Sequence, residues 1–399
     1  MKNVAVMGYG TVGSGVVEVL KTNKDAIAKK VGEELNVKYV LDLRDFPGDP
    51  VQEIITHNFD DILNDEEVNV VAEVMGGIEP AYTFTKKCLL AGKSVCTSNK
   101  ALVEKHGAEL LAIAKEKNVN YLFEASVGGG IPIIRPLHTC LTADVIEEIS
   151  GILNGTTNYM LTKMSAEGAD YDEVLKDAQA KGYAERNPEA DVEGHDPARK
   201  IAILTSLITG KKVDFEDLYC EGITKVTTED IAYAKKMGLA IKLLATSKKI
   251  GDQYSIMVSP KMIGASHPLF AVNDVFNAIF VKGNMLGDSM FYGSGAGKLP
   301  TASAVAGDIV EAAKVTGNTG HFWTEEKLTL ADISTVENKF FVRASVTAEE
   351  AKAAFGPVLV MDDVVDGEIG FVTETMTEAA YHACAAKLNG IISMIRVEG

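Results

Sequence analysis

The N-terminal segment KNVAVMGYGTVGSGVVEVL limits the fold of this chain more than any other stretch. Residues 4–7 form a short apolar run typical of a buried strand, and residues 12–20 carry apolar side chains at helical spacing. Between them lie Gly8, Gly10 and Gly13 in a G-x-G-x-x-G arrangement. This motif alone could be an ordinary tight turn. Placed between a strand and a helix, it predicts a dinucleotide-binding turn, with glycines for the turn, for close approach of pyrophosphate and for helix–strand packing.

The residues after this turn suggest how a nucleotide would be held. The backbone amides of Thr11 and Val12 open the predicted helix and are expected to receive the phosphates. Asp42 stands at the end of the predicted second strand and is our candidate for the ribose hydroxyls. An acid there repels a 2′-phosphate and favours NAD, whereas Arg44 nearby weakens that argument and keeps NADP as an alternative. The alternative role for Asp42 is to cap a loop.

Strands and helices alternate through the first third of the chain, so we predict an α/β fold with a Rossmann-type, doubly wound parallel sheet. We expect a dinucleotide-binding domain over residues 1–135, to which a helix at residues 299–316 returns. Residues 136–298 mix strands and helices and predict an α+β domain for catalysis and dimerisation. Residues 338–399 have the order βαββαβ, which is typical of a small ferredoxin-like domain.

Composition excludes several classes of protein. A net charge of −17 at pH 7 argues against nucleic acid or an anionic membrane as a partner. No apolar run approaches the roughly 18 residues of a membrane span, and a strand begins at once, which leaves no room for a signal peptide. We therefore expect a cytoplasmic protein. The cysteines show no metal-ligand spacing and are expected to be free thiols: Cys88, Cys96, Cys140, Cys220 and Cys384.

Polar residues follow two further predicted strands. Thr97, Ser98 and Lys100 come where a strand gives way to a helix, at the edge of the sheet where ligands bind in doubly wound folds. A lysine is unfavourable at a helix N-terminus, so Lys100 is either functional or an ordinary solvated side chain. Residues 124–132, EASVGGGIP, combine Glu124 with a glycine-rich turn. Such oxygen ligands suit a cation, although a hinge would have the same composition.

The segment DVEGHDPARKIAIL places Asp196 four residues before Lys200. With Pro197 next to it, Asp196 is expected to be the N-cap of a helix that starts at about residue 198. A surface pair of this kind contributes only roughly 0.3–0.5 kcal/mol. The alternative is a catalytic pair, because Lys200 adjoins a strongly apolar helix and because Glu185 lies in an acidic loop before it.

Six segments together resemble the homoserine dehydrogenase family, in the same order along the chain. They are GYGTVG, TSNKAL, EASVGGGIPIIRPL, GILNGTTNYML, GYAERNPEADVEGHDPARKIAIL and GSGAGKLPTASAVAGD. The resemblance implies an NAD(P)-dependent oxidoreductase that interconverts L-homoserine and L-aspartate 4-semialdehyde in threonine, methionine and isoleucine biosynthesis. It also implies a homodimer or larger homo-oligomer. The tail resembles an ACT domain, the amino-acid-sensing module of many family members.

The resemblance also implies residue roles. Lys200 matches the catalytic lysine, and Asp196 and Glu185 match carboxylates that bind homoserine. We assign to the substrate Glu185, Asp196, Lys100, Asn154 and Thr156. We assign to the nucleotide Gly8, Gly10, Thr11, Val12, Gly13, Asp42, Thr97, Ser98, Lys100, Gly182 and Gly297. A structural sodium ion is implied at Glu124, Val127, Gly129 and Ile131.

Two departures and two alternatives stay open at this stage. Family members that prefer NADP often have an arginine where Leu41 stands, which agrees with the argument from Asp42. The tail is shorter than a usual attached ACT domain, so whether threonine acts as an effector is open. Another amino-acid-aldehyde dehydrogenase, such as aspartate-semialdehyde dehydrogenase, would need a nucleophilic cysteine, and only Cys140 is remotely suitable. The other alternative is a non-catalytic amino-acid sensor.

Overall fold

The computed structural model describes residues 1–315, 317 and 322–398. The chain divides into two compact units, and each contains segments that are distant in sequence. The first consists of Met1–Val145, Ala202–Glu216 and Phe291–Leu328, and the second of Ile146–Ile201, Asp217–Met290 and Thr329–Gly399.

A six-stranded, all-parallel sheet forms the centre of the first unit, in the order β3-β2-β1-β4-β5-β6. The central strands are buried almost along their whole length, as expected for a parallel sheet that is covered on both faces. The order reverses between β1 and β4, which is the doubly wound arrangement that the sequence predicts. The strands are β1 (Lys2–Met7), β2 (Leu35–Leu41), β3 (Ile55–Thr56), β4 (Val68–Glu73), β5 (Ser94–Thr97) and β6 (Tyr121–Leu122).

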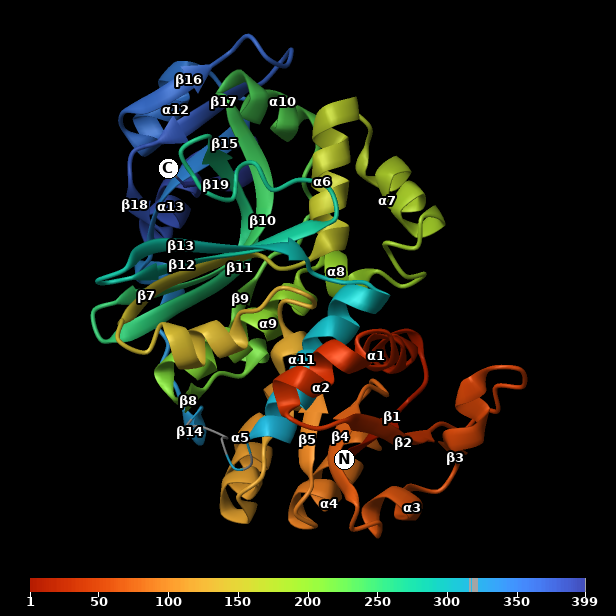
Figure 1. Cartoon of the computed structure of the whole chain (residues 1–399). Helices are drawn as coiled ribbons and strands as arrows, with labels where there is room; N and C mark the ends of the chain where they lie inside the picture. Colours follow the sequence, from red (N-terminus) through yellow and green to blue (C-terminus); the bar gives the residue numbers. More distant parts are fainter. Residues whose placement is uncertain (316, 318–321, 399) are drawn as a thin grey trace. The chain divides into compact units, whose positions relative to one another are not determined.

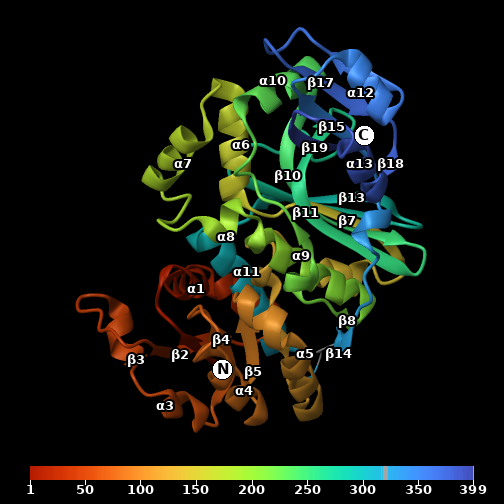
Figure 2. The same ribbon diagram turned by 180° about the vertical axis from the view of Figure 1, so that it is seen from behind.

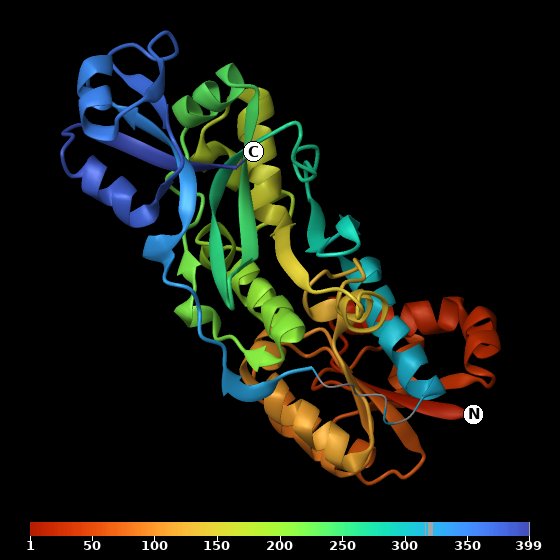
Figure 3. The same cartoon turned by 90° about the vertical axis from the view of Figure 1, so that its left-hand side faces the viewer.

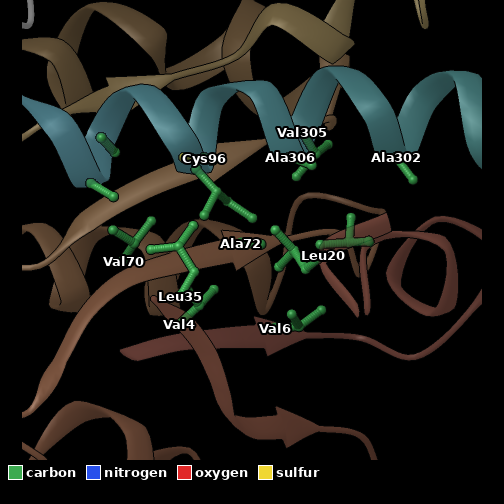
Figure 4. Packing of buried hydrophobic residues seen from close by; sticks show 14 of the residues in the cluster. Val4, Val6, Leu20, Leu35, Val70, Ala72, Cys96, Ala302, Val305 and Ala306 are labelled. Atoms are coloured by element: carbon green, nitrogen blue, oxygen red, sulfur yellow. The ribbon is translucent and has the colours of Figure 1, made fainter. Parts of the chain in front are cut away.

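Helices cover this sheet, and one of them comes from a distant part of the sequence. The helix predicted at residues 299–316 is α11, and residue 316 lies outside the described residues. It packs along α1, where a Cβ on Gly15 would lie 2.8 Å from the Cβ of Ala302 (Figure 1). Its small side chains Val305 and Ala306 reach the core over Ala72 and the other strand residues (Figure 4). The helices are α1 (Thr11–Thr22), α2 (Lys24–Val31), α3 (Phe59–Leu63), α4 (Ala81–Leu90), α5 (Lys100–Lys117) and α11 (Lys298–Lys314).

The second unit is built on a mixed sheet whose main path is β13-β12-β7-β10-β11-β19-β15-β17-β16. The long antiparallel pair of β10 and β11 runs through its middle, and α6 lies beside β10 (Figure 2). These strands are β7 (Ile146–Ile152), β10 (Leu239–Ile250), β11 (Gln253–Gly264), β12 (Phe276–Gly283) and β13 (Gly287–Ser294, which belongs to the first unit from Phe291 on). The helices are α6 (Gly155–Glu167), α7 (Tyr171–Ala180), α8 (Glu189–Val192), α9 (His195–Thr209, which continues into the first unit) and α10 (Thr228–Lys236).

The tail has the predicted βαββαβ order, with a two-residue strand, β18, in addition; Gly399 lies outside the described residues. Its two helices lie on one face of its strands, where Phe340, Phe371 and Tyr381 share an apolar core (Figure 3). The tail continues the main sheet, because β19 pairs in parallel with β11. Its elements are β15 (Glu337–Ala344), α12 (Ala348–Phe355), β16 (Val358–Met361), β17 (Ile369–Thr373), β18 (Met376–Thr377), α13 (Glu378–Ala385) and β19 (Ile391–Glu398).

Buried ion pairs fix the tail within the second unit. The Arg396 guanidinium is 1% exposed and donates to Glu378 of the tail and to Glu221 outside it. Arg343 is also buried and donates to Glu368 and to Asp230 of α10. No helix in the described part of the chain is long and apolar enough to cross a membrane.

Candidate active site

The glycine turn at the end of β1 has the geometry of a nucleotide-binding loop. Gly8 has a φ of +99°, and α1 begins three residues later with Gly10 as its N-cap. A Cβ on Gly13 would lie 1.9 Å from the carbonyl oxygen of Gly8, so only glycine permits this packing. A Cβ on Gly10, in contrast, would meet no atom within 4 Å. The space above Gly10 and the amides of Thr11 and Val12 is thus suited to an anionic ligand.

Beside this turn lies a pocket of about 550 Å³, within the usual range for small-molecule sites. It lies wholly in the first unit. Both apolar rings and charged groups line it, which suits a ligand with an aromatic base and a polar ribose. The lining residues are Gly8, Gly10, Leu41, Asp42, Leu43, Arg44, His57, Phe59, Val74, Met75, Gly76, Pro80 and Phe84.

Asp42 directly follows β2, as the sequence predicts, and several hydrogen bonds hold its carboxylate in the pocket. It accepts hydrogen bonds from the backbone N–H of Tyr9 (2.8 Å) and of Arg44 (3.0 Å). The Arg44 guanidinium donates to both carboxylate oxygens, each at 3.0 Å. The Arg44 pair and the two amides hold the pKa of Asp42 well below its usual range. Asp42 is therefore a charged acceptor throughout the physiological pH range.

Polar groups also end β4 and β5, at the same edge of the sheet. The Thr97 side chain is fully buried, and its hydroxyl donates to Glu73 at 2.6 Å. Asn99 caps α5 by accepting the N–H of Leu102, which makes Lys100 the first residue of that helix. The Thr97 side chain is thus held inside the fold by Glu73. Ser98 and Lys100 stand where the prediction places them, directly after β5.

The glycine-rich turn after β6 is organised by Glu124. Its carboxylate accepts the backbone N–H groups of Ile133 (2.5 Å), Ile134 (2.8 Å) and Arg135 (2.8 Å). The described residues contain no cluster of three His, Cys, Asp or Glu side chains able to hold a metal. A cation at Glu124, Val127, Gly129 and Ile131 would therefore depend largely on backbone carbonyls. Gly297, the other predicted contact of this unit, is the N-cap of α11 and has a φ of +114°.

Lys200 and Asp196 form a buried cluster in the second unit rather than a surface pair. Lys200 is 8% exposed and Asp196 is 4% exposed. The Lys200 Nζ donates to Asp196 Oδ2 (2.8 Å) and to the backbone oxygen of Leu153 (2.7 Å). The Asn154 amide donates to the same Asp196 oxygen (2.9 Å) and to Asp191 Oδ1 (2.8 Å). Two carboxylates, one ammonium and one amide are thus held together.

The structure corrects one local prediction. Asp196 is not the N-cap of a helix that starts at residue 198, because α9 begins at His195. Gly194, with a φ of +84°, closes the preceding turn, and its carbonyl accepts the N–H of Ala198. The glycine can adopt this conformation and so starts the helix earlier. The Asp196 carboxylate lies in the first turn of α9 and accepts hydrogen bonds from Lys200 and Asn154.

The remaining predicted site residues of this unit are Thr156, Gly182 and Glu185. The Thr156 hydroxyl donates to the backbone oxygen of Tyr183 (2.5 Å). Gly182, with a φ of +73°, and Glu185 both lie on the exposed loop after α7. Among the described residues, no hydrogen bond joins Glu185 to the Lys200 cluster. Asp191 was not predicted, although the acidic loop that contains it was noted.

The comparisons with known proteins agree with this geometry. The sequence model of the homoserine dehydrogenase NAD-binding domain matches residues 8–124, and that of the homoserine dehydrogenase domain matches residues 132–310. A Mycobacterium tuberculosis homoserine dehydrogenase is 39% identical over 99% of this chain and 97% of its own length. The Bacillus subtilis homoserine dehydrogenase is 43% identical over 79% of this chain and 75% of its own length. The chain belongs to the homoserine dehydrogenase family.

Solved structures of homoserine dehydrogenases share its fold. The enzyme from Thiobacillus denitrificans has a TM-score of 0.90 at 33% identity, covering 100% of this chain and 98% of that one. The S. aureus homoserine dehydrogenase at pH 6.5 has a TM-score of 0.83 at 32% identity, again covering 100% and 98%. A hyperthermophilic archaeal homoserine dehydrogenase solved with NADPH has a TM-score of 0.67 at 29% identity and covers 78% and 98%. Membership of this family sets aside the aspartate-semialdehyde dehydrogenase reading that depended on Cys140.

Proposed function

We propose that Lys200 exchanges the proton of the substrate hydroxyl in the NAD(P)-dependent interconversion of L-homoserine and L-aspartate 4-semialdehyde. The observation that supports this role is the buried position of Lys200, with its Nζ held by Asp196 Oδ2 and the Leu153 carbonyl. An amine fixed in this way loses little entropy when it meets a substrate oxygen. It is also shielded from bulk water, which strengthens its interaction with developing charge.

The bound nicotinamide supplies or accepts the hydride, and the chain's own residues manage the charge that results. In the reductive direction, negative charge builds on the carbonyl oxygen of the semialdehyde. The Lys200 ammonium stabilises this oxygen and then gives it a proton. In the oxidative direction, the neutral amine accepts the hydroxyl proton. Oxidation is therefore expected to be favoured by high pH.

The two carboxylates explain selectivity for an amino acid. Asp191 and Asp196 place two carboxylates at one amide, and Asp196 also contacts Lys200. Such a site favours the ammonium group of homoserine over a plain alcohol. Glu185 is the third acid that we assign to this ammonium, from its exposed loop. Lys100 and Thr156 are retained as proposed substrate contacts.

For the nucleotide, we infer a preference for NAD over NADP. The support is Asp42, which directly follows β2, lines the nucleotide-sized pocket and stays charged. A carboxylate can accept both ribose hydroxyls but repels a 2′-phosphate. Arg44 neutralises part of that charge, so NADP is expected to be a weaker substrate rather than excluded. Ser98, Gly182 and Gly297 are retained as proposed nucleotide contacts.

We retain Glu124, Val127, Gly129 and Ile131 as the residues proposed to hold a sodium ion. Glu124 fixes the turn through three backbone N–H groups, and the turn supplies backbone oxygens, the ligand type that hard cations prefer. The ion would stabilise the turn and take no part in hydride transfer. The ACT-like role of the tail, threonine as its effector, assembly into a homodimer and a cytoplasmic location are retained as predictions from the sequence.

The experiment is a steady-state assay of homoserine-dependent NADH formation, with Lys200→Ala as the test variant. We expect Lys200→Ala to bind NAD nearly as well as the original protein and to lose about 10²–10⁴ in turnover, the usual range for a lost acid–base group. NAD affinity is measured separately by fluorescence titration. Near-normal turnover of Lys200→Ala would contradict the role. Amino-acid binding by the original protein without any NADH formation would instead support the sensor alternative.

A further inference from the structure

Asn154 lies between β7 and α6, and its side-chain oxygen is fully used by the helix. As N-cap of α6, Asn154 Oδ1 accepts the backbone N–H of Thr157 at 2.9 Å and the Thr157 hydroxyl at 3.0 Å. These two donors fix the orientation of the amide, because only the oxygen can accept them. The amide nitrogen must therefore point away from the helix.

The amide nitrogen meets two carboxylates. One of its hydrogens goes to Asp191 Oδ1 (2.8 Å) and the other to Asp196 Oδ2 (2.9 Å). The same Asp196 oxygen accepts the Lys200 ammonium at 2.8 Å. Asn154 is itself only 6% exposed. Both amide hydrogens are thus used in one bridge between like charges.

We propose that Asn154 is a positioning residue for the reaction, rather than the substrate contact expected from the sequence. By joining the two carboxylates, the amide holds Asp196 against Lys200 and keeps Asp191 beside it. The amide is a neutral double donor between the two carboxylates and offsets their mutual repulsion. This role rests on the proposed function, because it concerns how Lys200 and the carboxylates proposed to bind the substrate ammonium are held next to each other.

Two substitutions separate this role from simple helix capping. Aspartate and serine are both good N-caps, so each preserves the start of α6. Asn154→Asp removes both amide donors and adds a third carboxylate beside Lys200, which favours the ammonium form. Asn154→Ser removes the donors without adding charge. Asp170→Ser is the matched control, since Asp170 caps α7 in the same unit and has no contact with the cluster among the described residues.

The experiment measures the pH dependence of kcat/KM for homoserine, together with kcat and KM, for the three variants and the original protein. For Asn154→Asp we expect the rise of kcat/KM with pH to move to higher pH by about one to two units, because the added carboxylate favours the ammonium form of Lys200. For Asn154→Ser we expect kcat/KM to fall by about 10²-fold, with a raised KM for homoserine. NAD affinity and the melting curve should match those of Asp170→Ser.

An unchanged pH profile for Asn154→Asp, with kcat/KM of both Asn154 variants within threefold of the original, would overturn the proposal and leave Asn154 as a cap alone. A raised pH profile in a variant that melts like Asp170→Ser would support it. Lys200→Ala distinguishes the two levels of the argument. If Lys200→Ala loses turnover while the Asn154→Asp profile stays unchanged, only the positioning role fails. If Lys200→Ala keeps turnover, the proposed function itself fails.

Discussion

Replacing Asp42 by asparagine is expected to shift nucleotide preference towards NADP, and replacing Arg44 by alanine to shift it the other way. The two side chains form a bidentate pair with both distances at 3.0 Å. Asp42→Asn removes the charge that repels a 2′-phosphate and releases the guanidinium to pair with that phosphate. Arg44→Ala leaves the Asp42 carboxylate without its counter-charge. The two shifts in NADP/NAD preference have opposite directions because both follow from the same Asp42–Arg44 pair. Measuring both variants is therefore a strict test.

The size of each effect can be worked from the positions of the charges. Two unit charges about 4 Å apart interact by about 1 kcal/mol in water and about 4 kcal/mol in a partly shielded site. The Arg44 side chain is 63% exposed and that of Asp42 is 10% exposed, so the pair lies nearer the aqueous limit. We therefore expect a change of about 10-fold in the ratio of the two kcat/KM values.

The assay is initial-rate kinetics with saturating homoserine and varied NAD or NADP, at low salt and at about 0.5 M salt. Added salt should reduce both shifts, because the groups are exposed to solvent. The KM for homoserine, measured separately with saturating nucleotide, should not change in either variant, which is the internal control. If both variants moved the NADP/NAD ratio in the same direction, or if neither moved it by threefold, the electrostatic account of nucleotide choice would be wrong.

Three further predictions concern stability and binding. Gly13→Ala should lose about 1–3 kcal/mol of folding free energy, because its Cβ would lie 1.9 Å from a backbone oxygen. Gly10→Ala, whose Cβ would enter open space, should melt normally but bind NAD at least tenfold less tightly. Melting curves check the first effect, and NAD titrations check the second. Burial raises the pKa of Asp308 to about 7, so the folded state keeps a proton that the unfolded state releases. The free energy of unfolding should therefore fall as pH rises from about 4 to about 7, by at most about 1.4 kcal/mol per pH unit. Asp308→Asn should lack that slope in denaturant unfolding followed by the fluorescence of the single tryptophan, which lies in the same unit. Arg396→Met should cost about 3–5 kcal/mol because it leaves the Glu378 carboxylate buried, and calorimetry should show recovery when Glu378→Leu is added.

The first unit was predictable because its signals are local. The glycine turn, the strand before it and the helix after it occupy one short segment, and the apolar runs of β1 and β4 fit a buried parallel sheet. The position of Asp42 could be predicted because the end of a strand fixes where the next side chain lies. A different local signal, the four-residue spacing on one helix face, predicted that Lys200 and Asp196 lie together.

The rest of the candidate site depends on contacts between distant residues. Asn154 meets Asp191 and Asp196 across 37 and 42 positions of sequence, so no periodicity could join them. The start of α9 was misplaced because proline and aspartate are typical of a helix start, whereas Gly194 could begin the helix earlier by adopting a positive φ. The bidentate role of Arg44 also needed the observed fold of its loop, because the sequence indicated only that it lay nearby.

The parallel pairing of β19 with Lys261, Met262 and Ile263 of β11 has a consequence for shortened forms of this protein. Removing roughly the last sixty residues would remove β19, the strand that pairs with the heavily buried strand β11. Unsatisfied N–H and C=O groups would then face water along an apolar ribbon, which is a template for aggregation. Changes to the tail are therefore better made by point substitution than by truncation.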